Sequence, residues 1–140
     1  MKKLRKRLIL LPVLACLVSL TLVVGAYAKF TQFATFEVWK TFDWHEEDDW
    51  HIGYGYARVT GDWNGKVGLQ IKYNRPVMKM TGYGMRDGSD ELWTWKFNLR
   101  MWGQKVKGTV TLISPNGVVT TGTAIGFWYP DKTGVLWLGA

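Results

Sequence analysis

The stretch Leu92–Trp102, which reads L-W-T-W-K-F-N-L-R-M-W, carries the clearest periodic pattern in the chain. Side chains alternate between the two faces of a β-strand, so the pattern predicts a strand with one buried and one exposed face. The apolar face consists of Trp93, Trp95, Phe97, Leu99 and Met101. Trp102 departs from the alternation, because it falls on the polar face. A face with three aromatic rings needs a core, so the neighbouring segments should also be strands.

Short segments separated by turn residues continue in both directions, and none has a helical pattern. In the first segment Phe36, Val38 and Phe42 are separated by even numbers of residues, so a strand would place them on the same face. The pair Asn64-Gly65 predicts a hairpin between the second and third segments, because both residue types tolerate positive φ. The predicted strands are 30–42, 51–60, 66–74, 77–85, 92–102, 105–113, 118–128 and 135–138.

Eight strands joined by short turns predict an all-β domain with the order of an antiparallel meander. Such a chain protects its edges by closing into a barrel or by packing as two sheets. Glycine inside a strand costs stability unless it permits a bend or close packing, and five of the predicted strands contain it. These glycines are Gly53, Gly55, Gly68, Gly82, Gly84, Gly108, Gly122 and Gly126. They favour a small antiparallel β-barrel or barrel-like β-sandwich over a flat sandwich.

Residues 1–28 have the layout of an export signal. Five cations lie within residues 1–7, residues 8–24 carry no charge, and Ala26-Tyr27-Ala28 matches a cleavage site. We therefore expect a signal-peptide helix over 1–28 and an exported all-β domain over 29–140, in a protein that is secreted or at the cell surface. The alternative is an uncleaved membrane anchor, because the apolar run is close to the ~20 residues that span a bilayer.

Most of the net charge belongs to this segment. The chain has 18 Lys and Arg against 11 Asp and Glu, a formal net charge of +7, and removing the five signal cations leaves +2. This balance gives no reason to expect nucleic acid as a partner, which needs clustered Lys and Arg on one face. Cys16 is the only cysteine and also lies in the signal. The exported domain therefore has no disulfide and no thiol nucleophile.

An acidic segment, 43–49, is predicted to be a loop, and it contains the densest set of metal-ligand residue types. The candidate ligands are His45, Asp48, Asp49 and His51. The segment lacks both the His-Glu-x-x-His motif of zinc proteases and the Asp-x-Asp-x-Asp-Gly spacing of calcium loops. A loose cation site is one interpretation and a solvated loop is the other. No cofactor is predicted.

Catalytic groups are scarce beyond the signal. The only histidines, His45 and His51, lie in or beside the acidic segment, and the only serines beyond the signal, Ser89 and Ser114, lie in predicted turns. The chain contains no Gly-x-Ser-x-Gly motif, phosphate-binding loop or dinucleotide fingerprint. We expect a protein that is not an enzyme, with paired carboxylates acting on a sugar as the alternative.

Aromatic residues in or beside predicted turns are the most informative functional feature. Exposed rings at loop tips tend to mark contact surfaces. We expect such rings to stack on a ligand while nearby polar groups bond to it. The candidate ligand-binding residues are Trp102, Arg100, Asn98, Trp63, Trp44 and Tyr129. The alternative is that these rings fold back as lids over the ends of a barrel.

We therefore expect an exported, non-catalytic binding domain whose partner is an extracellular glycan, an envelope component or a protein. An alternative is a secreted membrane-active or bacteriocin-like antimicrobial protein, whose Trp and Lys would meet a membrane surface. The segment Trp50–Gly55, W-H-I-G-Y-G, is similar to the Trp-x-x-Gly-Tyr-Gly opening of the lactococcin 972 family of secreted bacteriocins. This similarity covers six residues and implies no site residues. A third alternative is a barrel that holds a small apolar molecule, although the many interior rings favour a filled barrel.

Overall fold

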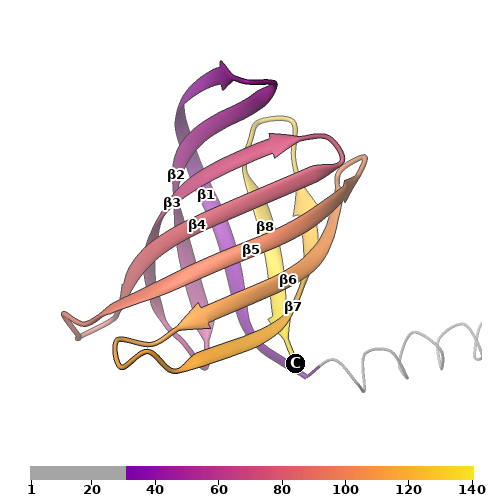
Figure 1. Ribbon diagram of the computed structural model, residues 1–140. Coiled ribbons are helices and arrows are strands. Elements are labelled where there is room, and N and C mark those ends of the chain that lie inside the picture. Colours follow the sequence, from indigo (N-terminus) through magenta and orange to yellow (C-terminus); the bar gives the residue numbers. More distant parts are fainter. Residues whose placement is uncertain (1–30) are drawn as a thin grey trace, which may run out of the picture. The chain divides into compact units, whose positions relative to one another are not determined.

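A computed structural model describes residues 31–140 of the chain, and its strands follow one another around a closed barrel (Figure 1). Each strand pairs antiparallel with the next, and the first pairs with the last. The strands are β1 (Gln32–Glu47), β2 (Trp50–Gly61), β3 (Gly65–Asn74), β4 (Val77–Arg86), β5 (Leu92–Trp102), β6 (Lys105–Ile113), β7 (Val119–Trp128) and β8 (Gly134–Gly139). The predicted export signal, 1–28, lies outside the described residues.

The all-β prediction and the eight-stranded meander are confirmed. Pairing between β1 and β8, from Gln32 opposite Gly139 to Val38 opposite Gly134, makes the fold a closed barrel rather than a sandwich. Every predicted strand overlaps an observed one, and β5 and β6 have the predicted bounds. No helix within residues 31–140 is both long enough and apolar enough to cross a membrane.

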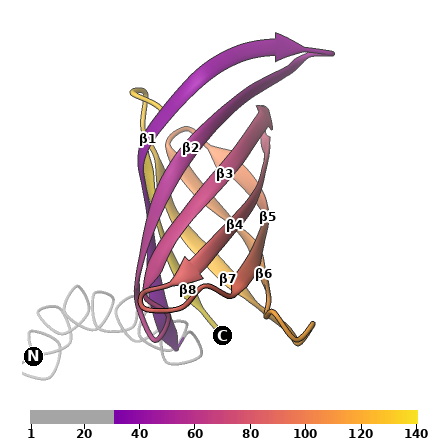
Figure 2. The ribbon, with the colours of Figure 1, turned by 90° about the vertical axis from the view of Figure 1, so that its left-hand side faces the viewer.

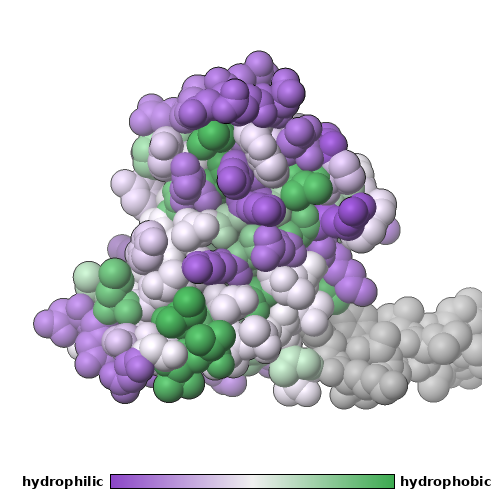
Figure 3. Space-filling model, in the orientation of Figure 1, coloured by the Kyte–Doolittle hydropathy of each residue, from purple (hydrophilic) through white to green (hydrophobic). Residues whose placement is uncertain are grey.

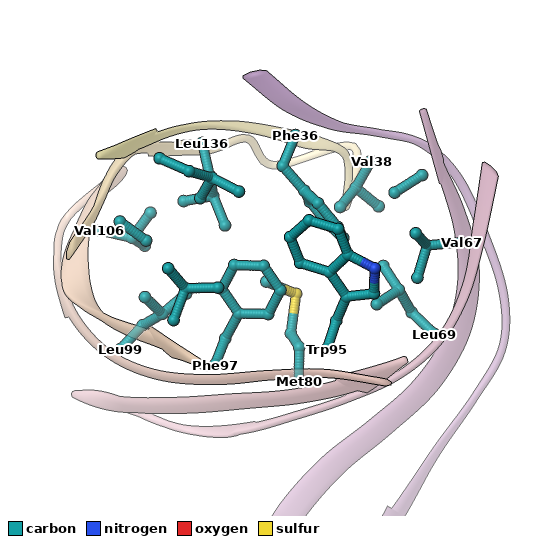
Figure 4. Packing of buried hydrophobic residues seen from close by; sticks show 14 of the residues in the cluster. Phe36, Val38, Val67, Leu69, Met80, Trp95, Phe97, Leu99, Val106 and Leu136 are labelled. Carbon is teal, nitrogen blue, oxygen red and sulfur yellow. The ribbon is translucent and has the colours of Figure 1, made fainter. Parts of the chain in front are cut away.

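Apolar side chains fill the interior of the barrel (Figure 4). The ring of Phe36 lies 5.4 Å from that of Trp95 and 4.7 Å from that of Phe97, measured between centroids. Within residues 31–140 no polar or charged residue is buried. The void between Met80 and Leu136 leaves no room for a water molecule. The interior is therefore filled, as its many rings predicted.

The predicted alternation of β5 is also confirmed. Its odd-numbered side chains point into the barrel and are buried from Trp95 to Met101, while Lys96, Asn98 and Arg100 are exposed on the outside. Gly108 of β6 lies opposite Leu99 of β5. A Cβ atom at Gly108 would collide with the backbone carbonyl oxygen of Asn98. Only glycine permits this close approach of β5 and β6.

The face of Phe42 differs from the prediction. The β1–β2 register shifts between Val38 and Lys40, and this bulge inverts the alternation that follows it. Phe42 consequently points outwards, where its ring lies against two tyrosines of β2. The prediction that Phe42 shares the face of Phe36 and Val38 is therefore wrong, because a period of two cannot reveal an inserted residue.

The predicted acidic loop is wrong for most of its length. β1 continues to Glu47 and β2 begins at Trp50, so only Asp48 and Asp49 form the turn. Both have positive φ, 49° and 66°, as a two-residue type I′ hairpin turn requires. The acidic residues therefore belong to a long hairpin whose tip extends beyond the neighbouring strands (Figures 1 and 2).

The hairpin predicted from Asn64-Gly65 is confirmed, but its turn is built differently. The residue with positive φ is Gly61, at 130°, and neither Asn64 nor Gly65 adopts that conformation. The Asn64 side chain instead closes the loop: its Nδ2 donates to the Gly61 carbonyl at 2.7 Å, and its Oδ1 accepts from the Gly61 N–H at 3.2 Å. The three-residue connection leaves the residue at its middle, Trp63, free to turn inwards.

Candidate functional site

Three of the predicted ligand-binding residues lie together on the outside of the barrel. Trp102, Arg100 and Asn98 border one surface depression of about 360 Å³, which we call the Trp102 depression. β4, β5 and β6 supply its lining, which comprises Val77, Asn98, Leu99, Arg100, Trp102, Lys107, Gly108 and Thr109. Asn98, Arg100 and Trp102 lie on the same face of β5, because alternate residues of a strand point the same way.

The β5–β6 turn presents the indole of Trp102. Gly103 follows it with a φ of 59°, and the Trp102 side chain is 59% exposed. Arg75, in the β3–β4 turn, donates from Nη1 to the Gly103 carbonyl oxygen at 3.0 Å. This bond links the β3–β4 turn to the β5–β6 turn, beside Trp102.

The depression combines an aromatic face with polar and cationic groups. The side chains of Asn98 and Thr109 are cross-strand neighbours, as are those of Arg100 and Lys107. The lining includes no acidic residue. The close contacts between basic and acidic side chains within residues 31–140 involve other residues, namely His45, His51 and Arg58. The site can thus donate several hydrogen bonds, attract negative charge and stack a ring.

Trp63 lies elsewhere, and the expectation that its ring is exposed is wrong. The residue is only 2% exposed, and its ring centroid lies 5.1 Å from that of Trp95 and 6.2 Å from that of Trp93, both near-perpendicular. The ring turns inwards because an indole gains more from the core than from water. Trp63 closes one end of the barrel, as the lid alternative describes.

Trp44 covers the other end and is half-buried. Its ring packs closely over Gly53 and lies 5.7 Å from that of Tyr73, while the Nζ of Lys132 sits 4.6 Å above it. Tyr129, in the β7–β8 connection, is exposed, and its ring is stacked on that of Phe127 in β7. Neither Trp44 nor Tyr129 borders the Trp102 depression.

The four candidate metal ligands do not converge. In the hairpin register Glu46 lies opposite His51, so these two share a face, and His45 points to the other face. Each histidine has its own partner: His45 lies 3.7 Å from Glu47, and His51 lies 3.2 Å from Glu46. No cluster of three or more His, Cys, Asp or Glu suited to a metal occurs within residues 31–140.

Sequence reasoning missed a second depression, of about 370 Å³, on the outer face of β1–β4. We call it the aromatic groove, because its lining contains the rings of Phe42, Tyr54, Tyr56 and Tyr83. Gly68 lies between two of these tyrosines in register, and a Cβ there would meet only a backbone oxygen at 4.0 Å. Alternating tyrosine and glycine in β2 was visible in the sequence, but the bulge that brings Phe42 to this face was not.

Comparisons with known proteins identify no relative: no family model, no curated protein and no solved structure matches the chain. The barrel surface is therefore the basis for inferring function. Of the six predicted ligand-binding residues, Trp102, Arg100 and Asn98 border one depression, and the other three lie outside its lining.

Proposed function

We propose that this chain is an exported, non-catalytic binding domain that recognises a glycan at the Trp102 depression. The observation that carries the proposal is the convergence of an exposed indole with amide, hydroxyl and cationic side chains around one depression. Sugars present C–H faces that pack on aromatic rings and hydroxyls that bond to amides and cations. Export is supported by the sequence pattern of residues 1–28.

The lining of the depression favours binding over catalysis. Hydrolysis of a glycosidic bond normally needs two carboxyl groups on either side of it, and the lining residues include none. They also include no histidine, serine or cysteine that could act as a base or nucleophile. The polar groups present are donors and hydroxyls, which suit recognition of a ligand that is left unchanged.

The test is calorimetric titration of the full chain with soluble oligosaccharides, including cell-wall fragments, chitohexaose and cellohexaose. Calorimetry keeps the readout independent of Trp102 fluorescence. Trp102→Ala should weaken binding roughly tenfold or more, because one stacked ring commonly contributes over 1.4 kcal/mol at a binding surface. Trp102→Phe, which keeps an aromatic face, should retain most of the affinity.

Trp39→Ala is the matched control, because Trp39 is also exposed, at 52%, and does not border the depression. This variant should bind as the unmodified chain does. The thermal midpoint of Trp102→Ala should stay close to that of the unmodified chain, since surface substitutions usually change stability by no more than ~0.5 kcal/mol. Equal glycan affinity in Trp102→Ala and the unmodified chain, or no affinity for any glycan, would contradict the proposal.

A membrane-active or bacteriocin-like protein is the second candidate, favoured by apolar residues at the barrel end opposite Trp102. Met85 and Leu92 flank the β4–β5 turn, Val118 and Val119 lie where the β6–β7 turn meets β7, and all four are exposed. Figure 3 shows hydrophobic surface at the lower left, where these turns lie in Figure 1. The full chain should then release dye from phosphatidylglycerol vesicles, and Val118→Ser with Val119→Ser should reduce the release. Vesicles that stay intact would eliminate this candidate.

A further inference from the structure

Charge is segregated on this barrel in a way that its net charge conceals. Each of the strands β3, β4, β5 and β6 carries two Lys or Arg residues, and the strands from β3 to β8 contain no Asp or Glu. The acidic residues within residues 31–140 lie in β1, in its hairpin turn and in the other connections. A chain with nearly balanced charge beyond its signal therefore presents one basic side.

The middle of that side forms a patch that we call the cationic face. It consists of the outward-facing residues Lys72, Lys79, Lys96, Arg100 and Lys107. The outer surfaces of β4–β6 face the viewer in Figure 1, and Figure 3 shows hydrophilic side chains across their middle. The face includes two residues of the Trp102 depression, so the two features are continuous.

Strand register sets like charges against each other within the cationic face. Lys72 lies directly opposite Lys79, and Arg100 lies directly opposite Lys107. Like charges in such cross-strand pairs are destabilising. None of these four has an acidic partner among the ion pairs of residues 31–140. An anionic ligand would relieve this repulsion. The cationic face is therefore complementary in charge to an anionic partner.

Hydrogen-bonding groups suited to sugar hydroxyls alternate with the cations. In register across β4, β5 and β6 lie Lys79, Asn98 and Thr109, and the adjacent row is Thr81, Lys96 and Thr111. Strands are ~4.8 Å apart and alternate residues of one strand ~6.7 Å apart, so several repeats of a polymer would meet both kinds of group.

The distribution of rings favours a glycan over a nucleic acid. Proteins that bind single-stranded nucleic acid place several base-stacking rings along the same groove as their cations. Here the four rings of the aromatic groove have no Lys or Arg in their lining. The rings at the cationic face are Trp102, in the depression, and Trp50, whose centroid lies 4.9 Å from the Nζ of Lys72, and they belong to different strands, β5 and β2.

We propose that the cationic face binds an acidic polysaccharide, and that its carboxylate or sulfate groups meet Lys79, Arg100 and Lys107 while Trp102 stacks on a sugar ring. This inference rests on the proposed glycan function and specifies the chemical class of its ligand. It also predicts that affinity decreases steeply with salt, because exposed charges are screened over ~10 Å at 0.1 M ionic strength.

The experiment titrates the full chain with polygalacturonate and with the same polymer after reduction of its carboxylates to alcohols, alongside heparin as the sulfated probe. Lys79→Gln combined with Lys107→Gln removes two charges from the face and keeps most of each side-chain stem. Lys40→Gln combined with Lys66→Gln removes two charges elsewhere on the outer surface. The first pair should weaken binding of the acidic polymers roughly tenfold, and the second less than about twofold, as expected for lost anion contacts.

The outcomes separate this inference from the function on which it rests. Two results together support the inference. The unmodified chain binds polygalacturonate or heparin more strongly than the reduced polymer, and the variant with Lys79→Gln and Lys107→Gln binds the acidic polymers more weakly. Equal binding of acidic and reduced polymers that only Trp102→Ala weakens overturns it and leaves the glycan function intact. Binding of single-stranded DNA or phosphatidylglycerol vesicles in place of every polysaccharide overturns both, as does the absence of any binding.

Discussion

Trp95 and Trp102 lie on the same strand, β5, and face opposite surroundings. Trp95 points into the barrel, is fully buried and is packed among other rings, whereas Trp102 is 59% exposed beside a depression lined with polar groups. The two residues are chemically identical. Their difference shows that burial, rather than residue type, separates a tryptophan that stabilises this fold from one that is available to a ligand.

The same division extends to the whole barrel. The buried residues of its inner face are hydrophobic, while the outer face of β3–β6 concentrates cations whose mutual repulsion opposes folding. Stability therefore comes from the interior, and the outer face is free to vary in chemistry. Substitutions on the inner face should therefore lower stability, whereas substitutions on the outer face should change it little. The variants below test this difference, from the largest expected effect to the smallest.

Trp95→Ala should produce the largest effect, a loss of ~3–5 kcal/mol in the free energy of unfolding. The ring contacts Phe36, Trp63 and Phe97, at centroid distances of 5.4, 5.1 and 6.3 Å, so its removal leaves a large cavity. Urea denaturation followed by circular dichroism measures the loss. A midpoint close to that of the unmodified chain would show that Trp95 does not belong to the core.

Gly108→Ala should cost less, ~1–3 kcal/mol, because the added methyl group collides with the backbone of Asn98 rather than with a flexible side chain. Relief of the collision requires β5 and β6 to separate locally. The same denaturation experiment gives the value. Full stability in this variant would mean that the close approach of the two strands is not needed for barrel curvature.

Gly68→Ala is the matched outer-face substitution and should have the smallest effect. The position is open, and alanine in a strand interior is favoured over glycine by ~0.5–1 kcal/mol, so stability should be unchanged or slightly raised. A destabilisation equal to that of Gly108→Ala would remove the distinction between the two faces.

Much of the fold could be predicted because its determinants are local. Alternation in β5 and turn residues at short intervals specify where strands begin and end, and eight such strands leave few ways to protect the edges. The proximity of Trp102, Arg100 and Asn98 was also accessible, because they are alternate residues of one strand.

The rest depended on tertiary structure. A single inserted residue after Val38 moves Phe42 to the other face, and the inward turn of Trp63 depends on a core built by distant strands. Net charge could not reveal the cationic face, because the opposition of Lys72 to Lys79 and of Arg100 to Lys107 exists only once strand register is known.

The pairing of β1 with β8 also bears on how the chain folds. Gln32 and Gly139 are partners although they are 107 residues apart, whereas every other pair of neighbouring strands is joined by a short connection. Contacts of such long range form slowly, because the loop between them must be closed first. Until β8 arrives, β1 and β7 each keep an unpaired edge that can recruit another chain. Because β8 follows the other seven strands in the chain, its pairing with β1 and β7 is what protects the forming barrel from aggregation.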